Sequence, residues 1–292
     1  MLEIEDIHKT FGEHKVLKGV SFSVEAGQIY GLIGKNGAGK TTLMNIMAGL
    51  SGPDTGKCLL LGNSISSNTN VVRIGYLPDL PAFFDYLTVD EYIDFLLKGK
   101  DRVRKNNLIE MVDLPNTAKI ATMSRGMRQR LGIAAAIIND PDVVLLDEPT
   151  SALDPSGRAD VMKILLGLKQ EGKAIVLSTH ILADMERVCD KVGFLSDGTI
   201  RKELNVEDLK DGCSFVRITF AEEIGKVTSI IQASEIPFEI IDGHIFRFAI
   251  DDKRQSEDQK KVFSFLANAN LLIKSIQNES QNLDKIFEEV CR

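Results

Sequence analysis

The sequence predicts an α/β fold followed by a smaller α+β domain, and three observations lead to this prediction. A short apolar run, Gln28–Ile33, feeds a glycine-rich stretch that opens onto a helix-compatible segment. Two further apolar runs, Val143–Leu146 and Ala174–Leu177, have the character of buried strands and alternate with helical segments, as around a parallel sheet. After about Lys210 the order of elements changes to βαββαβ.

Length and composition fit a globular protein of two domains. The chain has 292 residues, which suits a large domain over 1–210 and a small one over 211–292. Hydrophobic residues make up 43% and charged residues 26%, ordinary values for a soluble protein. The formal net charge is −7, and neither domain is basic. This charge disfavours DNA or RNA as the main partner.

Cysteine spacing and hydropathy indicate the compartment. The four cysteines lie far apart without C-x-x-C spacing, so we expect reduced thiols rather than a zinc site or disulfides. No apolar run approaches the roughly 18 residues that a membrane span needs. Met1 leads directly into a strand-like segment with no signal peptide. We therefore expect a cytoplasmic protein whose membrane role comes through a partner.

The first elements are expected to be strands, a helix and a turn. Leu2–Ile7 alternates apolar and polar residues, as a half-buried strand does, and Val20–Val24 resembles another strand. The helix after the glycine-rich stretch closes at Gly49, and dense turn chemistry over 51–56 separates it from a short strand, Lys57–Leu61.

A helical subdomain is predicted at about residues 80–140. Thr88 and Glu91 form a capping box at a helix start. The predicted helices cover Asp90–Lys98, Arg102–Val112 and the segment from Ser124 to Ile138.

Helices and strands continue to alternate in the rest of the chain. The first domain should add helices Ala159–Gln170 and Ile181–Val188 and a hairpin around Asp197-Gly198. The second should contain strand Phe215–Phe220, helix Glu222–Ala233, hairpin strands Phe238–Ile241 and His244–Ala249, helix Gln255–Ala267, strand Leu271–Ile276 and helix Asn282–Val290. This order is the ferredoxin-like split βαβ pattern with one helix appended.

The glycine-rich stretch carries the strongest chemical signal. Gly34, Gly39, Lys40 and Thr41 fit G-x-x-x-x-G-K-[ST], the phosphate-binding loop. Glycines let backbone N–H groups turn inward around a polyphosphate, and the following helix adds positive charge at its N-terminus. Lys40 is expected to reach the β and γ phosphates, and Thr41 to offer its hydroxyl to Mg²⁺. A chance glycine turn is the disfavoured alternative, because the pattern is rare.

Polar residues at strand ends supply candidates for catalysis. The strand Val143–Leu146 ends at Asp147, placed to hold Mg²⁺, and Glu148 is placed to orient or deprotonate the attacking water. The alternative is a solvated acidic turn. His180 follows another apolar strand and can reach a γ-phosphate, although a lone histidine is more often structural. Ser124 and the nearby glycine offer a second anion site at a helix start, or a plain helix cap.

Four separated motifs together resemble the ATP-binding cassette (ABC) ATPases. They are GKNGAGKTT (34–42), MSRGMRQR (123–130), VVLLDEPTSALD (143–154) and STH (178–180). The resemblance covers residues 1 to about 205. It implies a phosphate-loop NTPase cassette with an antiparallel β subdomain and a helical subdomain, which binds ATP and Mg²⁺.

The resemblance also implies residue roles. Phe11 matches the aromatic that stacks on adenine. The alternative is that Phe11 is an aromatic of the core or of a turn. The phosphate cradle comprises Gly34, Asn36, Gly37, Gly39, Lys40, Thr41 and Thr42. Ser124 and Gly126 match the signature that caps the γ-phosphate bound to the opposite protomer. Asp154 matches the acid that links the two sites of the dimer. His180 matches the switch histidine. A head-to-tail homodimer around two ATP molecules follows.

Two positions depart from the family pattern. The signature LSGGQ appears as Met123–Met127, in which the serine and glycine that touch phosphate survive. The glutamine that contacts Mg²⁺ and senses the membrane partner is replaced by Asp79. A carboxylate still binds Mg²⁺ or water but donates no hydrogen bond. We therefore expect ATP binding to persist and the coupling to the partner to change.

The leading hypothesis is the ATPase subunit of a drug- or bacteriocin-exporter, peripheral on the inner face of the cell membrane. An integral-membrane permease is the expected partner and should dock at Leu80–Asn116. Phe83, Phe84 and Tyr86 there are either partner contacts or core residues. One alternative is a soluble ABC-type ATPase acting on nucleic acid or ribosomes, which the acidic balance disfavours. A non-hydrolysing nucleotide sensor, suggested only by Asp79, is another.

Overall fold

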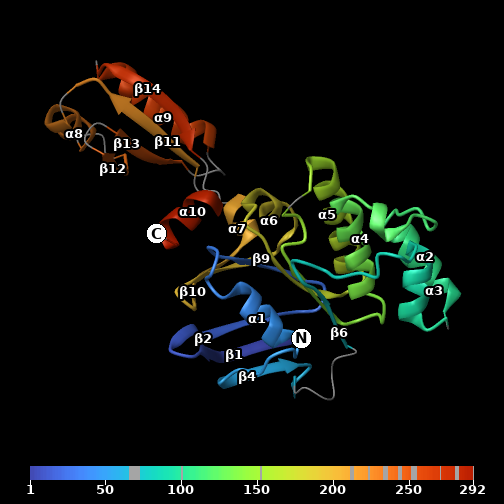
Figure 1. The fold of residues 1–292 in the computed structure, drawn as a ribbon. Helices are drawn as coiled ribbons and strands as arrows, with labels where there is room; N and C mark the ends of the chain where they lie inside the picture. The colour runs from blue at the N-terminus through green and yellow to red at the C-terminus, as the bar shows by residue number, and fades with distance from the viewer. Residues whose placement is uncertain are drawn as a thin grey trace. The chain divides into compact units, whose positions relative to one another are not determined.

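The protein consists of two compact units (Figure 1). The computed structural model describes residues 1–65, 73–99, 101–151, 153–210, 214–222, 224–232, 236–242, 245–250, 255–269, 271–279 and 283–291. The first unit comprises Met1–Val206 with Phe287–Arg292, and the second Glu207–Ile286. The sequence predicts a boundary near residue 210 and assigns the last residues to the second domain. In the structure those last residues belong to the first unit.

A six-stranded sheet forms the centre of the first unit, in the order β10-β9-β3-β8-β7-β6. Its strands are β3 (Ile29–Ile33), β6 (Ile74–Leu77), β7 (Val143–Asp147), β8 (Ala174–Ser178), β9 (Lys191–Ser196) and β10 (Thr199–Asn205). All pair in parallel except β10, which is antiparallel to β9. The strands β3, β7 and β8 are buried along their whole length, which explains their unbroken apolar sequences.

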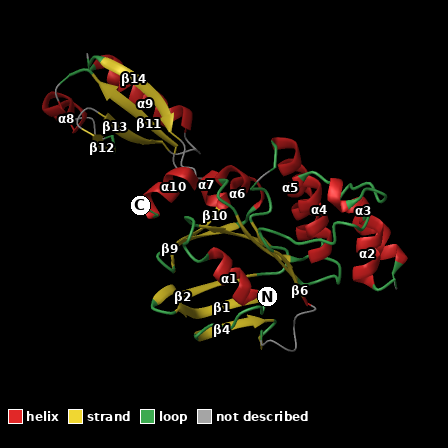
Figure 2. Cartoon of the chain, in the orientation of Figure 1, coloured by secondary structure: helices red, strands yellow, loops and turns green. Residues whose placement is uncertain are grey.

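An antiparallel sheet lies beside the central one, in the order β2-β1-β4-β5. It contains β1 (Leu2–Phe11), β2 (His14–Val24), β4 (Thr55–Leu60) and β5 (Asn63–Ser64). Helix α1 (Lys40–Met47) lies between the two sheets (Figures 1 and 2), and its buried Leu43 and Met44 join residues of both sheets in one core. β2 starts earlier than the predicted Val20 because residues from His14 onward pair with β1.

The helical subdomain gathers at one side of the first unit (Figure 2). It contains α2 (Val89–Leu97), α3 (Arg102–Met111), the short 3₁₀ turn Ile120–Thr122 and α4 (Arg125–Ala136). The predicted capping box is confirmed, since the Thr88 side chain accepts from Glu91 N and the Glu91 carboxylate accepts from Thr88 N. Ser124 caps α4, as predicted, by accepting a hydrogen bond from Met127 N at 3.2 Å.

Helices α5 (Pro155–Gln170) and α6 (Leu182–Val188) complete the first unit, and α7 (Val206–Lys210) follows it. The predicted hairpin around Asp197-Gly198 is confirmed, with both residues at positive φ and Ser196 paired with Thr199. Of the four cysteines, Cys58, Cys189 and Cys291 are buried and unpaired, while Cys213 lies outside the described residues.

The second unit has the predicted βαββαβ order. It contains β11 (Ser214–Phe220), α8 (Ile224–Gln232), β12 (Phe238–Asp242), β13 (Ile245–Ile250), α9 (Gln255–Asn268) and β14 (Ile273–Glu279), before α10 (Leu283–Val290). The sheet order β12-β13-β11-β14 is antiparallel throughout. Alternate residues of β11 and β13 point into its core, among them Ile218, Phe246 and Phe248.

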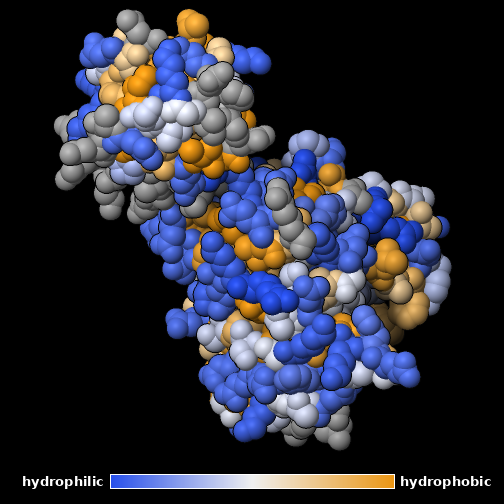
Figure 3. Space-filling model, turned by 90° about the vertical axis from the view of Figure 1, so that its left-hand side faces the viewer, coloured by the Kyte–Doolittle hydropathy of each residue, from blue (hydrophilic) through white to orange (hydrophobic). Residues whose placement is uncertain are grey.

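Exposed apolar residues are scattered on the face drawn in Figure 3, which is largely hydrophilic where it is coloured. Within the described ranges, no helix combines the length and apolar character that crossing a bilayer requires.

Close packing between β6 and α4 gives a test of the fold. A Cβ added at Gly75 lies 2.1 Å from the backbone oxygen of Ala136, whereas one added at Gly167 in α5 meets nothing within 4 Å. We expect Gly75→Ala to lower the free energy of unfolding by about 1–3 kcal/mol, because backbone must move. Gly167→Ala should raise it by about 0.5–1 kcal/mol. Chemical denaturation followed by circular dichroism measures both changes, and equal stabilities of the two variants contradict this packing.

Candidate functional site

The glycine-rich loop connects β3 to α1 in the geometry that phosphate binding needs. Gly39 has φ 106° and precedes the first residue of α1. Two features disfavour a side chain at this position: the φ angle is left-handed, and an added Cβ would lie 2.8 Å from the Leu17 side chain. Lys35, Asn36 and the glycine after them are exposed. The loop therefore presents backbone N–H groups beside a helix N-terminus.

Lys40 is held inside the loop that precedes it. Its side chain is buried, and Nζ donates hydrogen bonds to the carbonyl oxygens of Gly34 at 2.7 Å and Lys35 at 3.3 Å. Burial lowers the pKa of Lys40, and the negative charges of Glu148 and Asp147 partly oppose that shift. A cation is thus already fixed where loop and acids meet.

Two acids stand at the end of β7, beside the end of β8. The register pairs Asp147 with Ser178. The Ser178 hydroxyl donates to Asp147 Oδ1 at 2.6 Å, whereas the buried Oδ2 has no hydrogen-bond partner in the part of the chain that the structure describes. Glu148 has φ 52°, a left-handed conformation that costs a non-glycine residue about 1–3 kcal/mol. Its N–H donates to the Ser178 carbonyl oxygen at 3.1 Å and lies 3.0 Å from Ser178 Oγ.

His180 contacts the second of these acids. Its Nδ1 lies 2.9 Å from Glu148 Oε2, and the side chains are 57% and 13% exposed. The hydrogen bond requires a proton on Nδ1, so Nε2 is left to face solvent or a ligand. The predicted base and the predicted switch histidine therefore form one hydrogen-bonded pair.

A cavity of about 370 Å³ joins the loop to the acids. It is lined by His14, Val16, Asn36, Gly37, Gly39, Lys40, Thr41, Thr42, Asp79, Asp147 and Glu148. Nine of these are predicted site residues, and His14 and Val16 are additions. His14 pairs with Phe11 in the β1–β2 hairpin. His14 and Val16 could therefore have been suspected from the sequence, because they lie only a few residues after Phe11, the predicted adenine-stacking aromatic.

Asp79 lies exposed on the wall of this cavity, with Asp147 and Glu148. Burial, followed by the charges of Asp147 and Asp79, raises the pKa of the nearby Tyr76 to about 12. The Tyr76 hydroxyl donates to Asn45 Oδ1 at 3.1 Å. Negative charge is thus concentrated at the end of β6 and β7, where a cation is best accommodated.

The donor set fits a magnesium ion. Asp147 Oδ2, the Thr41 hydroxyl and Asp79 are oxygen donors on one cavity, and the first is buried without a partner among the described residues. The described residues contain no group of three or more His, Cys, Asp or Glu side chains arranged for a metal. Mg²⁺ in nucleotide sites is held by one or two carboxylates plus phosphate oxygens rather than by a protein cage.

The remaining predicted residues lie outside this cavity's lining. Ser124 is exposed, and a Cβ at Gly126 meets Leu153 at 3.4 Å, which brings the signature beside the segment before α5. Asp154 is exposed and caps α5, since Gly157 N donates to its Oδ1 at 2.9 Å. These three residues therefore do not line the cavity formed by the loop and acids of their own chain.

Phe11 is 54% exposed at the end of β1, and the Lys9 ammonium lies 5.5 Å from its ring centroid. An aromatic with half of its surface exposed contributes little to the core, so the ring is free to stack on a planar ligand.

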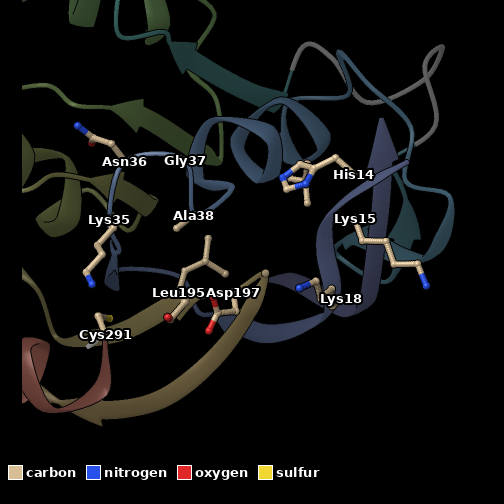
Figure 4. A pocket seen from close by; sticks show the side chains of 13 residues that line it. His14, Lys15, Lys18, Lys35, Asn36, Gly37, Ala38, Leu195, Asp197 and Cys291 are labelled. Carbon is tan, nitrogen blue, oxygen red and sulfur yellow. The ribbon is translucent and has the colours of Figure 1, made fainter. Parts of the chain in front are cut away.

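Two further hollows flank the loop. One, of about 290 Å³, lies between the loop, the start of β2 and the β9–β10 turn; Figure 4 shows Lys35 and Cys291 on one side of it and Lys18 on the other. Burial raises the pKa of the Cys291 thiol. The other contains His180 and Phe287, with Gly34 and its neighbours. The end of the chain thus lines both hollows, which the sequence did not predict.

The comparisons with known proteins agree with this geometry. The profile of a family described as "ABC transporter" matches residues 17–151. The uncharacterized ABC transporter ATP-binding protein sll0415 of Synechocystis is 42% identical over 68% of this chain and 60% of its own length. The bacitracin transport ATP-binding protein BcrA of Enterococcus faecalis is 32% identical over 99% of this chain and 96% of its own length. The chain belongs to the ABC transporter ATP-binding proteins.

Solved cassettes have the same fold as the first unit. The dimeric structure of MJ0796, a bacterial ABC transporter cassette, is 26% identical with a TM-score of 0.64, covering 70% of this chain and 99% of that one. A post-hydrolysis state of MJ0796 bound to ADP and Pi is 25% identical with a TM-score of 0.63. The predicted phosphate-loop cassette fold is therefore confirmed. The cassette binds nucleotide, hydrolyses ATP and acts as the ATP-binding subunit of a transporter, with a partner in the membrane.

The exposed ring of Phe11 gives a test of nucleotide contact. We expect Phe11→Ala to raise the dissociation constant for ATP roughly 5- to 150-fold, because base–aromatic stacking is worth about 1–3 kcal/mol. Phe11→Tyr, which keeps the ring, should bind as the parent does. Calorimetric titration measures the constants, and thermal unfolding should be the same for all three proteins. Unchanged affinity in Phe11→Ala excludes stacking on this residue.

Proposed function

We propose that this cassette powers an exporter of the drug- or bacteriocin-resistance kind by hydrolysing MgATP in a head-to-tail homodimer. The observation that carries the proposal is the convergence of Lys40, Asp147 and Glu148 on one cavity. BcrA is named for bacitracin transport, and the linearmycin resistance ATP-binding protein LnrL of Bacillus subtilis is 30% identical over 98% of this chain; both names support the proposal.

The chain's own groups divide the work of hydrolysis. The loop N–H groups and Lys40 bind the β and γ phosphates and offset their charge. Thr41 and Asp147, with Asp79 nearby, would hold Mg²⁺, which would supply further charge neutralisation. Glu148 accepts the proton of the attacking water, and His180 orients the Glu148 carboxylate through their 2.9 Å hydrogen bond.

A second copy completes each site in this proposal. Ser124, Gly126 and Asp154 do not line the cavity of their own chain. Ser124 and Asp154 are exposed at the N-termini of α4 and α5, where backbone N–H groups suit an anion. The signature of one copy then closes on the γ-phosphate held by the other, and Asp154 links the two sites.

An exposed aromatic cluster supports the docking of a permease on the helical subdomain. Leu80 is 78% exposed, Tyr86 75%, Phe95 58% and Phe84 45%. The Phe84 ring lies 6.0 Å from that of Tyr86 and 5.5 Å from that of Phe95. Phe83, in contrast, packs edge-on against Tyr92 at 5.5 Å and serves the interior of the subdomain. Contiguous exposed apolar rings are typical of interaction sites.

The alternative of a cassette acting on nucleic acid or ribosomes is not favoured. The chain carries a net charge of −7, whereas binding to phosphate backbones depends on lysine and arginine. Its relatives are transport and resistance proteins by name.

The decisive variant is Glu148→Gln. It keeps the shape of the side chain but cannot accept a proton, so ATP turnover should fall about 100-fold or more while ATP binding persists. With ATP and Mg²⁺ the variant should accumulate as a dimer on size exclusion. Glu171→Gln, at an exposed acid after α5, is the matched control and should behave as the parent. Turnover of Glu148→Gln at the parental rate rules out Glu148 as the base.

Asp79→Gln tests the coupling to the permease. The substitution removes one negative charge from the cavity wall and adds a hydrogen-bond donor. Permease-stimulated turnover should change more than the dissociation constant for ATP. Turnover should be measured with the permease in membrane vesicles and ATP affinity on the isolated cassette. A change confined to affinity removes Asp79 from the coupling role.

A further inference from the structure

Ser178 contacts both acids of the site. It is the last residue of β8, and its side chain is fully buried. Parallel pairing of β7 with β8 sets Ser178 directly beside Asp147. A hydroxyl at this position thus lies against two functional groups that the sequence separates from it by about thirty residues.

The hydroxyl has one proton and uses it on Asp147. Ser178 Oγ donates to Oδ1 at 2.6 Å, in a buried setting where hydrogen bonds to charged groups are strong. Oδ2 of the same carboxylate is buried and lacks a partner among the described residues. Ser178 therefore fixes the rotation of the carboxylate and leaves one defined oxygen for Mg²⁺ or a water bound to it.

The lone pair of the same hydroxyl faces Glu148. Glu148 N donates to Ser178 Oγ at 3.0 Å and to the Ser178 carbonyl oxygen at 3.1 Å. These bonds hold the N–H of a residue whose φ of 52° is unfavourable for any side chain except glycine. The carboxylate of Glu148 is thereby directed to its contact with His180.

We propose that Ser178 is a positioning residue for ATP hydrolysis, which orients the Asp147 carboxylate toward Mg²⁺ and holds Glu148 in its left-handed conformation. This inference rests on the proposed roles of Asp147 and Glu148. In this proposal Ser178 acts through these two acids.

The test begins with Ser178→Ala and Ser178→Thr. Ser178→Ala removes only the hydroxyl, so kcat should fall roughly 10- to 150-fold, the loss of one hydrogen bond to a charged group. Its dissociation constant for ATP in EDTA should stay within about twofold of the parent's, because the loop is intact. The gain in ATP affinity on adding Mg²⁺, measured by calorimetry, should shrink. Ser178→Thr keeps the hydroxyl and should restore kcat and the Mg²⁺-dependent gain.

A different pattern overturns the proposal. If Ser178→Ala keeps the parental kcat and Mg²⁺-dependent gain, Ser178 positions neither acid. If Ser178→Ala lowers the ATP affinity in EDTA and the thermal stability as strongly as it lowers kcat, Ser178 supports only the fold. The threonine methyl has little room at a fully buried site, so a double-mutant cycle provides a second measurement. In an Asp147→Asn background, Ser178→Ala should leave the Mg²⁺-dependent gain unchanged; equal losses in both backgrounds contradict action through Asp147.

The proposed function is tested separately by the acids themselves. Parental turnover in both Asp147→Asn and Glu148→Gln defeats the hydrolytic assignment. Loss of turnover in those two variants with parental behaviour of Ser178→Ala defeats only the role of Ser178.

Discussion

The pairing of β7 with β8 is the interaction on which the site depends. Both strands are buried along their length, so their register is fixed by packing on two faces as well as by the parallel ladder. That register places the end of one strand, with its two acids, beside the end of the other, with Ser178 and His180. A shift of one residue would turn Asp147 away from Ser178 and into the layer of helices.

Electrostatics at the site is balanced before any ligand binds. Lys40 is buried next to two carboxylates and is held by carbonyl oxygens of its own loop. Burying a cation is unfavourable, and nearby acids and hydrogen bonds offset that cost. An incoming polyphosphate therefore meets a lysine that is already desolvated, and it has to replace only two carbonyl contacts. The additional charge of Asp79 makes this cavity more negative than a glutamine there would.

Much of this arrangement could be predicted from the sequence, because the signals were local. The strand before Gly34 and the helix after it follow from an apolar run and a glycine pattern, and the capping box at Thr88 follows from residue types three apart. The predictions differ from the structure mainly at the ends of the elements. At β2, for example, pairing with β1 extends the strand beyond its apolar residues. Contacts between distant segments were not predictable in this way. The bond between Ser178 and Asp147 is not encoded in a spacing, since it depends on how β7 and β8 lie side by side.

The path of the chain has a consequence for how this protein is dissected. The backbone leaves the first unit after Val206 and re-enters it at Phe287, and the re-entering residues Phe287 and Cys291 line the hollows beside the phosphate loop. The ferredoxin-like module is therefore an insertion anchored at both ends rather than an appendage. Ending the chain at residue 206 would therefore also remove Phe287 and Cys291 from the hollows beside the phosphate loop.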